Sequence, residues 1–170
     1  MKHRLDKSLK TVFFDSIPVI LPNNRVYNRL GYLKEKTVLS SSQEKDINSS
    51  IEFAKTFITI KAAVKYLTIE KINSSKVFLT NGVVLESKLL VELFKNDIEV
   101  LFMATTAGTA IIKEIKSKVQ AGDLKVAVIF DAVASEMVDI SFDWIRAYFN
   151  HQFSRENKML SKKRFSPGYG

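Results

Sequence analysis

An Asn-Gly pair between two apolar runs is the feature that most restricts the fold of this chain. Residues 76–80 (KVFLT) precede Asn81-Gly82, and residues 83–85 (VVL) follow. The central residues of a type I′ turn need positive φ, which Asn and Gly adopt most readily, and the twist of this turn matches that of two antiparallel strands. We therefore predict a β-hairpin here, within a mainly antiparallel sheet.

Residues 124–152 are compatible with two structures. One is a strand at 126–130 followed by a shorter helix, and the other is a single long helix capped by Asp123. We favour the long helix because apolar residues then fall on one stripe at ~100° per residue. The stripe consists of Val128, Val138, Phe142, Ile145 and Phe149.

Acidic residues of this helix provide candidate site groups. Asp131 lies near the middle of the stripe, where a carboxylate must be paired, hydrogen-bonded or exposed in a cleft, and a buried hydrogen-bonded Asp is the favoured interpretation. Glu136 and Asp143 fall on the opposite side and are expected to be solvated, and Asp139 is intermediate.

The remaining elements follow from apolar periodicity and cap residues. Strands or extended segments are predicted at 11–20, 59–70 and 98–104, and helices at 22–30, 42–57, 88–95 and 109–120. Ser41 and Glu44 have the spacing of a capping box for the second helix. We predict an α+β fold: a mainly antiparallel twisted sheet with flanking helices, one of them long and near the C-terminus, in a single domain over residues 1–170.

The composition restricts the class of protein. Hydrophobic residues make up 46% of the 170 residues, which is typical of a folded domain. The net charge of +8 is compatible with an acidic protein partner or nucleic acid, but the lysines are mostly single and alternate with acids. Cysteine is absent, which excludes disulfides and fits a cytoplasmic protein. We expect neither a nucleic-acid nor a membrane partner.

The last seven residues, Arg164–Gly170 (RFSPGYG), combine a cation, a turn and an aromatic ring. Pro167 and Gly168 suit positions i+1 and i+2 of a type II turn, which would bring Tyr169 back toward Arg164. A guanidinium beside a phenol ring suits a small ligand with a carboxylate and a flat or cationic part. The alternative is a basic tail without a site.

Other motifs are weaker. Thr105–Gly108 joins a predicted strand to a helix N-terminus, where free N–H groups bind anions in many folds, but an ordinary turn is the favoured interpretation. His3 and His151 have no metal-ligand spacing, and no nucleophile motif is present. We expect no metal site and no catalytic residue.

The sequence resembles the activation domain of vitamin B12-dependent methionine synthase. Four segments, together spanning roughly residues 17–170, carry the resemblance. They are Val26–Tyr32 (VYNRLGY), Phe102–Gly108 (FMATTAG), Gly122-Asp123 with Asp131–Glu136 (DAVASE), and Arg164–Gly170, which matches the family's Arg-x-x-x-Gly-Tyr element. Family members continue beyond this element, so the resemblance implies a stand-alone, C-terminally shortened form.

The resemblance implies an accessory role in methionine biosynthesis rather than catalysis by the domain alone. Such domains bind S-adenosylmethionine and present its methyl group to an oxidised cobalamin carried by the methyltransferase. A flavodoxin-like donor supplies the electron for this reductive remethylation. The implied partners are a cobalamin-binding methionine synthase or another corrinoid protein and, as a further candidate, the flavodoxin-like reductant.

Site residues follow from the same resemblance. Arg164 would hold the ligand carboxylate, Gly168 and Tyr169 would lie along the ligand, and the backbone near Ser166 would contact the adenine side. Asp15 is a candidate for the family's acidic contact in the N-terminal part. Two alternatives remain: an interaction module that keeps the fold without binding the ligand, and a basic nucleic-acid-binding domain.

Overall fold

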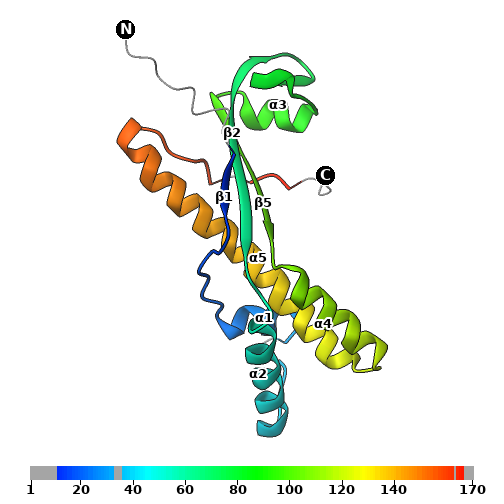
Figure 1. The fold of residues 1–170 in the computed structure, drawn as a ribbon. Coiled ribbons are helices and arrows are strands. Elements are labelled where there is room, and N and C mark those ends of the chain that lie inside the picture. The colour runs from blue at the N-terminus through cyan, green and yellow to red at the C-terminus, as the bar shows by residue number, and fades with distance from the viewer. Residues whose placement is uncertain (1–10, 33–35, 163, 167–170) are drawn as a thin grey trace. The chain divides into compact units, whose positions relative to one another are not determined.

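The chain divides into two compact units, shown in Figure 1. The computed structural model describes residues 11–32, 36–162 and 164–166. The sheet unit comprises Met1–Asp15 and Lys61–Thr105, and the helical unit comprises Ser16–Ile60 and Thr106–Gly170. The predicted α+β class is confirmed, because helices accompany an antiparallel sheet and a long helix lies near the C-terminus.

The sheet unit is built around one long strand. The strands run in the order β1-β2-β3-β4, and β5 also pairs with β2. Antiparallel pairing joins β1 to β2 (Val12 opposite Val64) and β2 to β3 (Ile72 opposite Val77). The elements are β1 (Val12–Phe14), β2 (Lys61–Ile72), β3 (Lys76–Leu79), β4 (Val84–Glu86), α3 (Lys88–Phe94) and β5 (Glu99–Thr106).

The β-hairpin is confirmed, but its loop comprises three residues, Thr80–Gly82, rather than the Asn81-Gly82 pair alone, because Phe78 pairs with Val84. Asn81 has φ of 69° and Gly82 has φ of 72°, the positive values for which these two residue types are suited. The N–H of Leu79 donates to the carbonyl of Val83 at 2.8 Å and closes the turn between β3 and β4. The hairpin contributes to an apolar core of the sheet unit that contains Leu67, Val77, Leu79 and Val100.

The helical unit is organised by α5 (Leu124–Phe153), and the prediction of a single long helix is confirmed. Asp123 caps it, since its Oδ1 accepts from the N–H of Val126 at 3.4 Å. Three further helices pack against α5: α1 (Asn23–Arg29), α2 (Ser41–Lys55) and α4 (Thr109–Gln120). None of the helices in the described ranges is both long enough and apolar enough to cross a membrane.

The N-terminus of α2 corrects one prediction. The capping box is formed by Ser40 and Gln43, not by Ser41 and Glu44. The Oγ of Ser40 accepts from the N–H of Gln43 at 3.3 Å, and the Oε1 of Gln43 accepts from the N–H of Ser40 at 2.9 Å. Both pairs have the spacing Ser-x-x-Glu/Gln, so the spacing alone did not decide between two starts one residue apart.

The chain reverses direction after α5 and returns along it. Asn157 adopts φ of 55°, in the left-handed region that Asn tolerates at helix ends. The N–H of Lys158 then donates to the carbonyl of Phe153 at 3.0 Å, and the N–H of Leu160 donates to the Oδ1 of Asn150 at 2.7 Å. We call residues 157–162 with 164–166 the return segment, and it places Arg164 beside Asp139 and Phe142 in the middle of α5.

Candidate functional site

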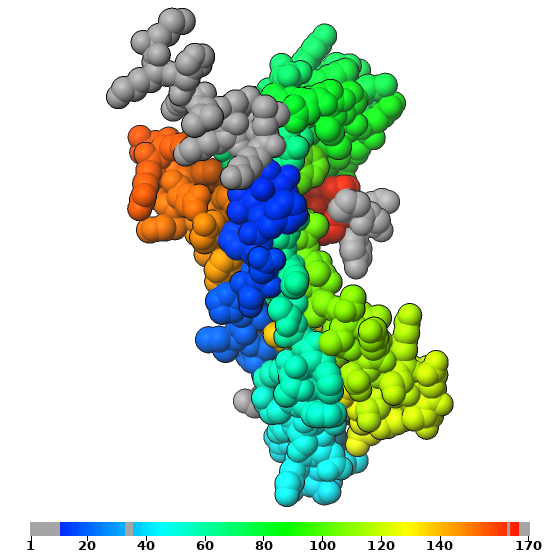
Figure 2. Space-filling view, viewed as in Figure 1, coloured from blue at the N-terminus to red at the C-terminus, as the bar shows by residue number. Residues whose placement is uncertain are grey.

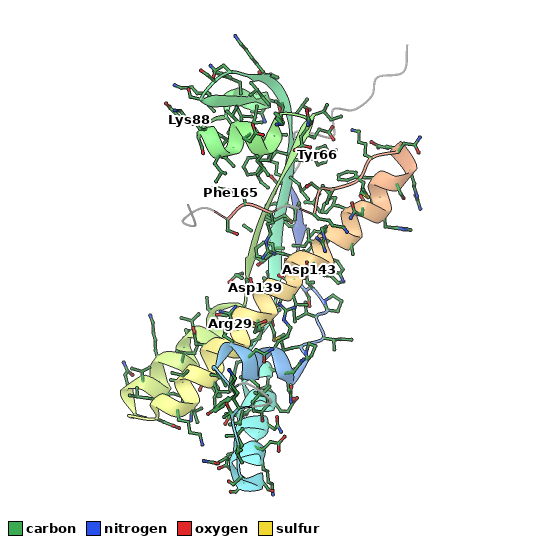
Figure 3. All side chains as sticks on the ribbon, turned by 180° about the vertical axis from the view of Figure 1, so that it is seen from behind. Arg29, Tyr66, Lys88, Asp139, Asp143 and Phe165 are labelled. Atoms are coloured by element: carbon green, nitrogen blue, oxygen red, sulfur yellow. The ribbon has the colours of Figure 1, made fainter. Side chains whose placement is uncertain are left out.

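A chain of alternating charges joins α1, α5 and the return segment, and we call it the ion network. Both α1 arginines lie on one helical face, four residues apart. Figure 3 shows Arg29 beside Asp139, where its Nη2 donates to Oδ2 of that residue at 2.7 Å. The network consists of Arg25, Glu136, Arg29, Asp139 and Arg164.

Glu136 is the centre of the network and corrects the expectation that it is solvated. Its side chain is only 10% exposed. The Nε of Arg25 donates to its Oε2 at 2.8 Å, and the Nε of Arg29 donates to its Oε1 at 2.6 Å. The hydrogen bond to Glu136 raises the pKa of Arg29, with Asp139 and Asp131 adding smaller effects and burial opposing them. Both carboxylate oxygens are thus satisfied, which permits burial of the charge.

Arg164 lies at the outer end of the network. Its guanidinium carbon is 4.8 Å from the centre of the Phe142 ring, within the range of a cation–π contact. Its Nη2 is 3.9 Å from Oδ1 of Asp139, an ion pair longer than a hydrogen bond. The Arg164 side chain is 42% exposed and that of Asp139 is 38% exposed. The guanidinium is therefore oriented by the protein while keeping donors that face solvent.

The other predicted site residues are only partly covered by the structure. Ser166 is described and exposed. Pro167, Gly168 and Tyr169 lie outside the described residues, so the predicted approach of Tyr169 to Arg164 stays a prediction. Asp15 is exposed and belongs to the sheet unit.

The favoured interpretation of Asp131 as a buried carboxylate is wrong. Asp131 is exposed, and so is Val128, which is 58% exposed although it was placed on the buried stripe. The buried face of this part of α5 is instead formed by Phe130, Val133 and Met137. Water therefore solvates the Asp131 carboxylate, which needs no hydrogen-bonded site in the interior.

The turn before α4 has the geometry of an ordinary strand-to-helix connection. Gly108 has φ of +90°, and a Cβ there would meet the carbonyl oxygen of Thr59 at 3.4 Å. The Oγ1 of Thr106 accepts from the N–H of Gly108 at 3.1 Å, and the N–H of Thr59 donates to the carbonyl of Ala107 at 3.2 Å. These contacts explain the glycine by its backbone conformation and a close approach.

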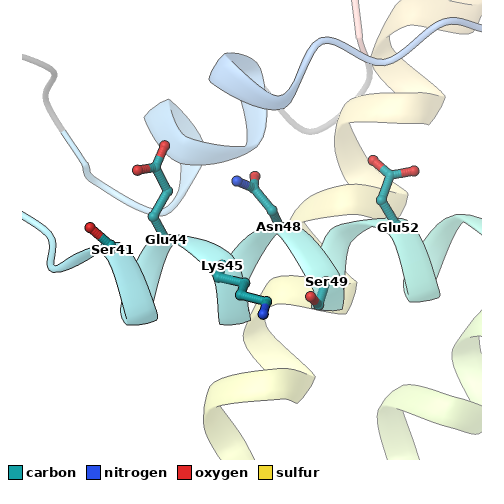
Figure 4. Close-up of a pocket in the computed structure, with 6 residues that line it drawn as sticks. All are labelled: Ser41, Glu44, Lys45, Asn48, Ser49 and Glu52. Carbon is teal, nitrogen blue, oxygen red and sulfur yellow. The ribbon is translucent and has the colours of Figure 1, made fainter.

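Figure 4 shows a shallow depression on α2, and the described residues that line it all belong to that helix. Two lining residues are hydrogen-bonded to α1. The Oδ1 of Asn48 accepts from Asn23 at 3.1 Å and from Tyr27 at 3.2 Å, and the carbonyl of Glu44 accepts from the Tyr27 hydroxyl at 3.4 Å. A surface formed by one helix face does not enclose a ligand. The lining residues are Ser41, Glu44, Lys45, Asn48, Ser49 and Glu52.

Tyr27 links α1 to α2, since its hydroxyl donates to the Oδ1 of Asn48 at 3.2 Å. Burial raises the pKa of its phenol, and Glu44 and Tyr32 raise it further. A raised folded pKa means that the phenol stabilises the protein fully below its unfolded pKa of about 10, and that this contribution is lost as pH rises through the folded pKa. We expect the midpoint of denaturant unfolding to fall more steeply above about pH 10 in the unmodified protein than in Tyr27→Phe. Equal slopes for the two proteins would contradict this.

The sequence signals for the ion network were partial. The spacing of Arg25 and Arg29 indicates one cationic face on α1, but nothing in it identifies Glu136, more than a hundred residues away, as the partner. The placement of Arg164 over the Phe142 ring depends on the turn at Asn157, and that turn was not predicted from the sequence.

No protein-family model matches the chain, and no curated protein is significantly similar to it.

Proposed function

We propose that this protein is an S-adenosylmethionine-binding accessory module that supports the reductive remethylation of cobalamin in a methionine synthase or a related corrinoid methyltransferase. The observation that carries the proposal is the placement of Arg164. Its half-exposed guanidinium is fixed over the Phe142 ring and beside the Asp139 carboxylate. A guanidinium oriented by an aromatic ring and next to a carboxylate suits the amino-acid end of such a ligand.

The charge balance of the ion network supports binding of a carboxylate. Three guanidinium groups face two carboxylates, so one positive charge is in excess. Glu136 is already bonded through both oxygens to Arg25 and Arg29, and Asp139 is held by Arg29 at 2.7 Å. Arg164, with the longest ion pair of the network, is the cation best placed to take an added carboxylate, and a planar guanidinium binds one through two parallel hydrogen bonds.

The aromatic and acidic groups suit the cationic part of the ligand. A sulfonium is attracted to a ring face, and in this proposal Tyr169 provides that face, because Arg164 already lies over the Phe142 ring. Asp139, still 38% exposed, provides a carboxylate for the ligand's ammonium group. In this proposal Ser166, Gly168 and Tyr169 complete the site along the rest of the ligand.

Equilibrium dialysis with S-adenosylmethionine tests the proposal. We expect saturable binding by the unmodified protein and a loss of affinity of about 10- to 100-fold in Arg164→Ala, because hydrogen bonds to charged groups contribute about 1.5–3 kcal/mol. Arg164→Lys keeps the charge without the planar fork and should fall between the two.

Arg146→Ala is the matched control for these variants. Arg146 lies on α5 and is 41% exposed, and its one ion pair among the described residues is with Asp143 at 3.4 Å. We expect its affinity to equal that of the unmodified protein. Absence of saturable binding at millimolar ligand would refute ligand binding, and an unchanged affinity in Arg164→Ala would place the site elsewhere.

A second function is favoured by the same contact. Asp139 already neutralises part of the charge of Arg164, so the network is stable without a ligand and suits an interaction module that retains the fold. Such a module would bind its protein partner equally well with and without S-adenosylmethionine. Titration of a corrinoid methyltransferase with and without the ligand separates the two functions.

The proposed setting follows from the proposed activity. The partner is the cobalamin-carrying protein, with a flavodoxin-like donor supplying the electron, and the module acts as part of that methyltransferase system rather than as an enzyme alone. The proposal includes a cytoplasmic location, with which the absence of cysteine is compatible.

A further inference from the structure

The turn between α4 and α5 presents aliphatic side chains to solvent, and we call residues 109–128 the helical tip. Two lie on α4, seven residues apart and so on one face, and two lie on α5, four residues apart. On the face shown in Figure 2, α2 (cyan) leaves the surface of the tip (yellow-green) uncovered. The exposed fractions are 47% for Ile112, 50% for Val119, 59% for Leu124 and 58% for Val128.

The same two helices carry lysines that have no partner among the described residues. Among the described residues, none of the four lysines of the tip has an ion-pair or hydrogen-bond partner, whereas Lys55 and Lys95 each bind a glutamate on their own helix. The tip carries two acids, and one of them, Asp123, is engaged as the cap of α5. The tip therefore has a net positive charge. Its lysines are Lys113, Lys116, Lys118 and Lys125.

We propose that the helical tip is the docking surface for an acidic partner protein whose contact face places apolar side chains within a ring of carboxylates. The choice of the flavodoxin-like reductant as this partner rests on the proposed function. Apolar area at the centre of a contact supplies affinity, and complementary charge at its rim accelerates and orients association. A second copy of this chain is disfavoured because it would bring eight lysines together.

Other polyanions fit the tip less well. Lysines bind phosphates, but the tip has no aromatic ring for base stacking, and it presents β-branched and Leu side chains that a phosphate backbone does not cover. A helix that lies on a membrane has a broad apolar face with aromatic residues, whereas each helix of the tip exposes only two separated aliphatic side chains.

Charge reversal tests the proposal with purified oxidised flavodoxin as the probe. We expect binding to weaken by at least about tenfold in Lys116→Glu/Lys125→Glu and by a similar factor in Val119→Ser/Leu124→Ser at low ionic strength. Binding by the unmodified protein should weaken as salt is raised. The matched control is Lys71→Glu/Lys88→Glu, which reverses two exposed lysines of the sheet unit and should bind as the unmodified protein does.

The outcomes separate the two proposals when dialysis with S-adenosylmethionine is done in parallel. The docking proposal is overturned if flavodoxin does not bind, and also if it binds the tip variants and the control with equal affinity. In either case, binding of S-adenosylmethionine would leave the proposed ligand-binding function standing. If neither ligand nor flavodoxin binds, the proposed function fails as well. Tip-dependent binding of duplex DNA or anionic vesicles without binding of flavodoxin would also overturn the docking proposal.

Discussion

Phe130→Ala should lower the free energy of unfolding by about 3–5 kcal/mol, the usual range for removing a large buried aromatic side chain. Phe130 is fully buried on α5, and its ring lies 6.0 Å from that of Phe53 and 6.3 Å from that of Phe57. The substitution removes the contact between α5 and the C-terminal end of α2 and leaves a cavity between them. Because aromatic pairs add about 0.5–1.5 kcal/mol beyond their buried area, we expect a value in the upper part of the range.

The measurement uses two probes of the same transition. Guanidinium unfolding can be followed by helical circular dichroism and by the fluorescence of Trp144, the only tryptophan and itself on α5. Val128→Ala is the control because it removes an exposed side chain from the same helix and should change stability by less than about 0.5 kcal/mol. Similar midpoints for the two variants would show that Phe130 does not anchor α2.

Glu136→Ala should be the second most damaging change, with a loss of about 2–3 kcal/mol. Removing one member of a buried ion pair costs about 3–5 kcal/mol. The expected loss in the free energy of unfolding is smaller here, because the two arginines are 41% and 38% exposed and are solvated by water once Glu136 is removed. The variant leaves Arg25 without its carboxylate and Arg29 with only Asp139, so α1 loses its main polar attachment to α5.

Denaturant unfolding of a pair of isosteric variants checks the origin of this effect. Glu136→Gln keeps the shape and removes the charge, so it should lose slightly less stability than Glu136→Ala. Asp143→Asn removes an exposed carboxylate from the same helix, whose ion pair with Arg146 is 3.4 Å long, and should change stability by less than about 0.5 kcal/mol. Equal losses in Glu136→Gln and Asp143→Asn would mean that the ion network does not hold α1 in place.

The secondary structure was largely predictable because its signals are local. The Asn-Gly turn requires positive φ at both residues, and the cap at Asp123 was identified correctly. The helix at Thr109–Gln120 has the predicted bounds, and α5 ends one residue later than predicted. Each of these features depends on residues within a few positions of one another.

The faces of α5 were less predictable. Residues 126–134 (VAVIFDAVA) are almost all apolar, so hydropathy does not define a single stripe there. Asp131 was the informative residue, because its charge favours solvent and so implies that the opposite side is buried. The burial of Glu136 depends on Arg25 and Arg29, and such long-range compensation has no local signature in the sequence.

If the protein binds a carboxylate ligand as proposed, the return segment has a consequence for the thermodynamics of that binding. A free tail would have to lose its backbone and side-chain conformational freedom at the moment of binding, and this loss would weaken the affinity. Here the turn at Asn157, the amide of Leu160 bound to Asn150 and the ring of Phe142 have already restricted Arg164 during folding. A carboxylate that reaches this guanidinium therefore meets a preorganised receptor, and most of the entropy of ordering the cation does not oppose its binding.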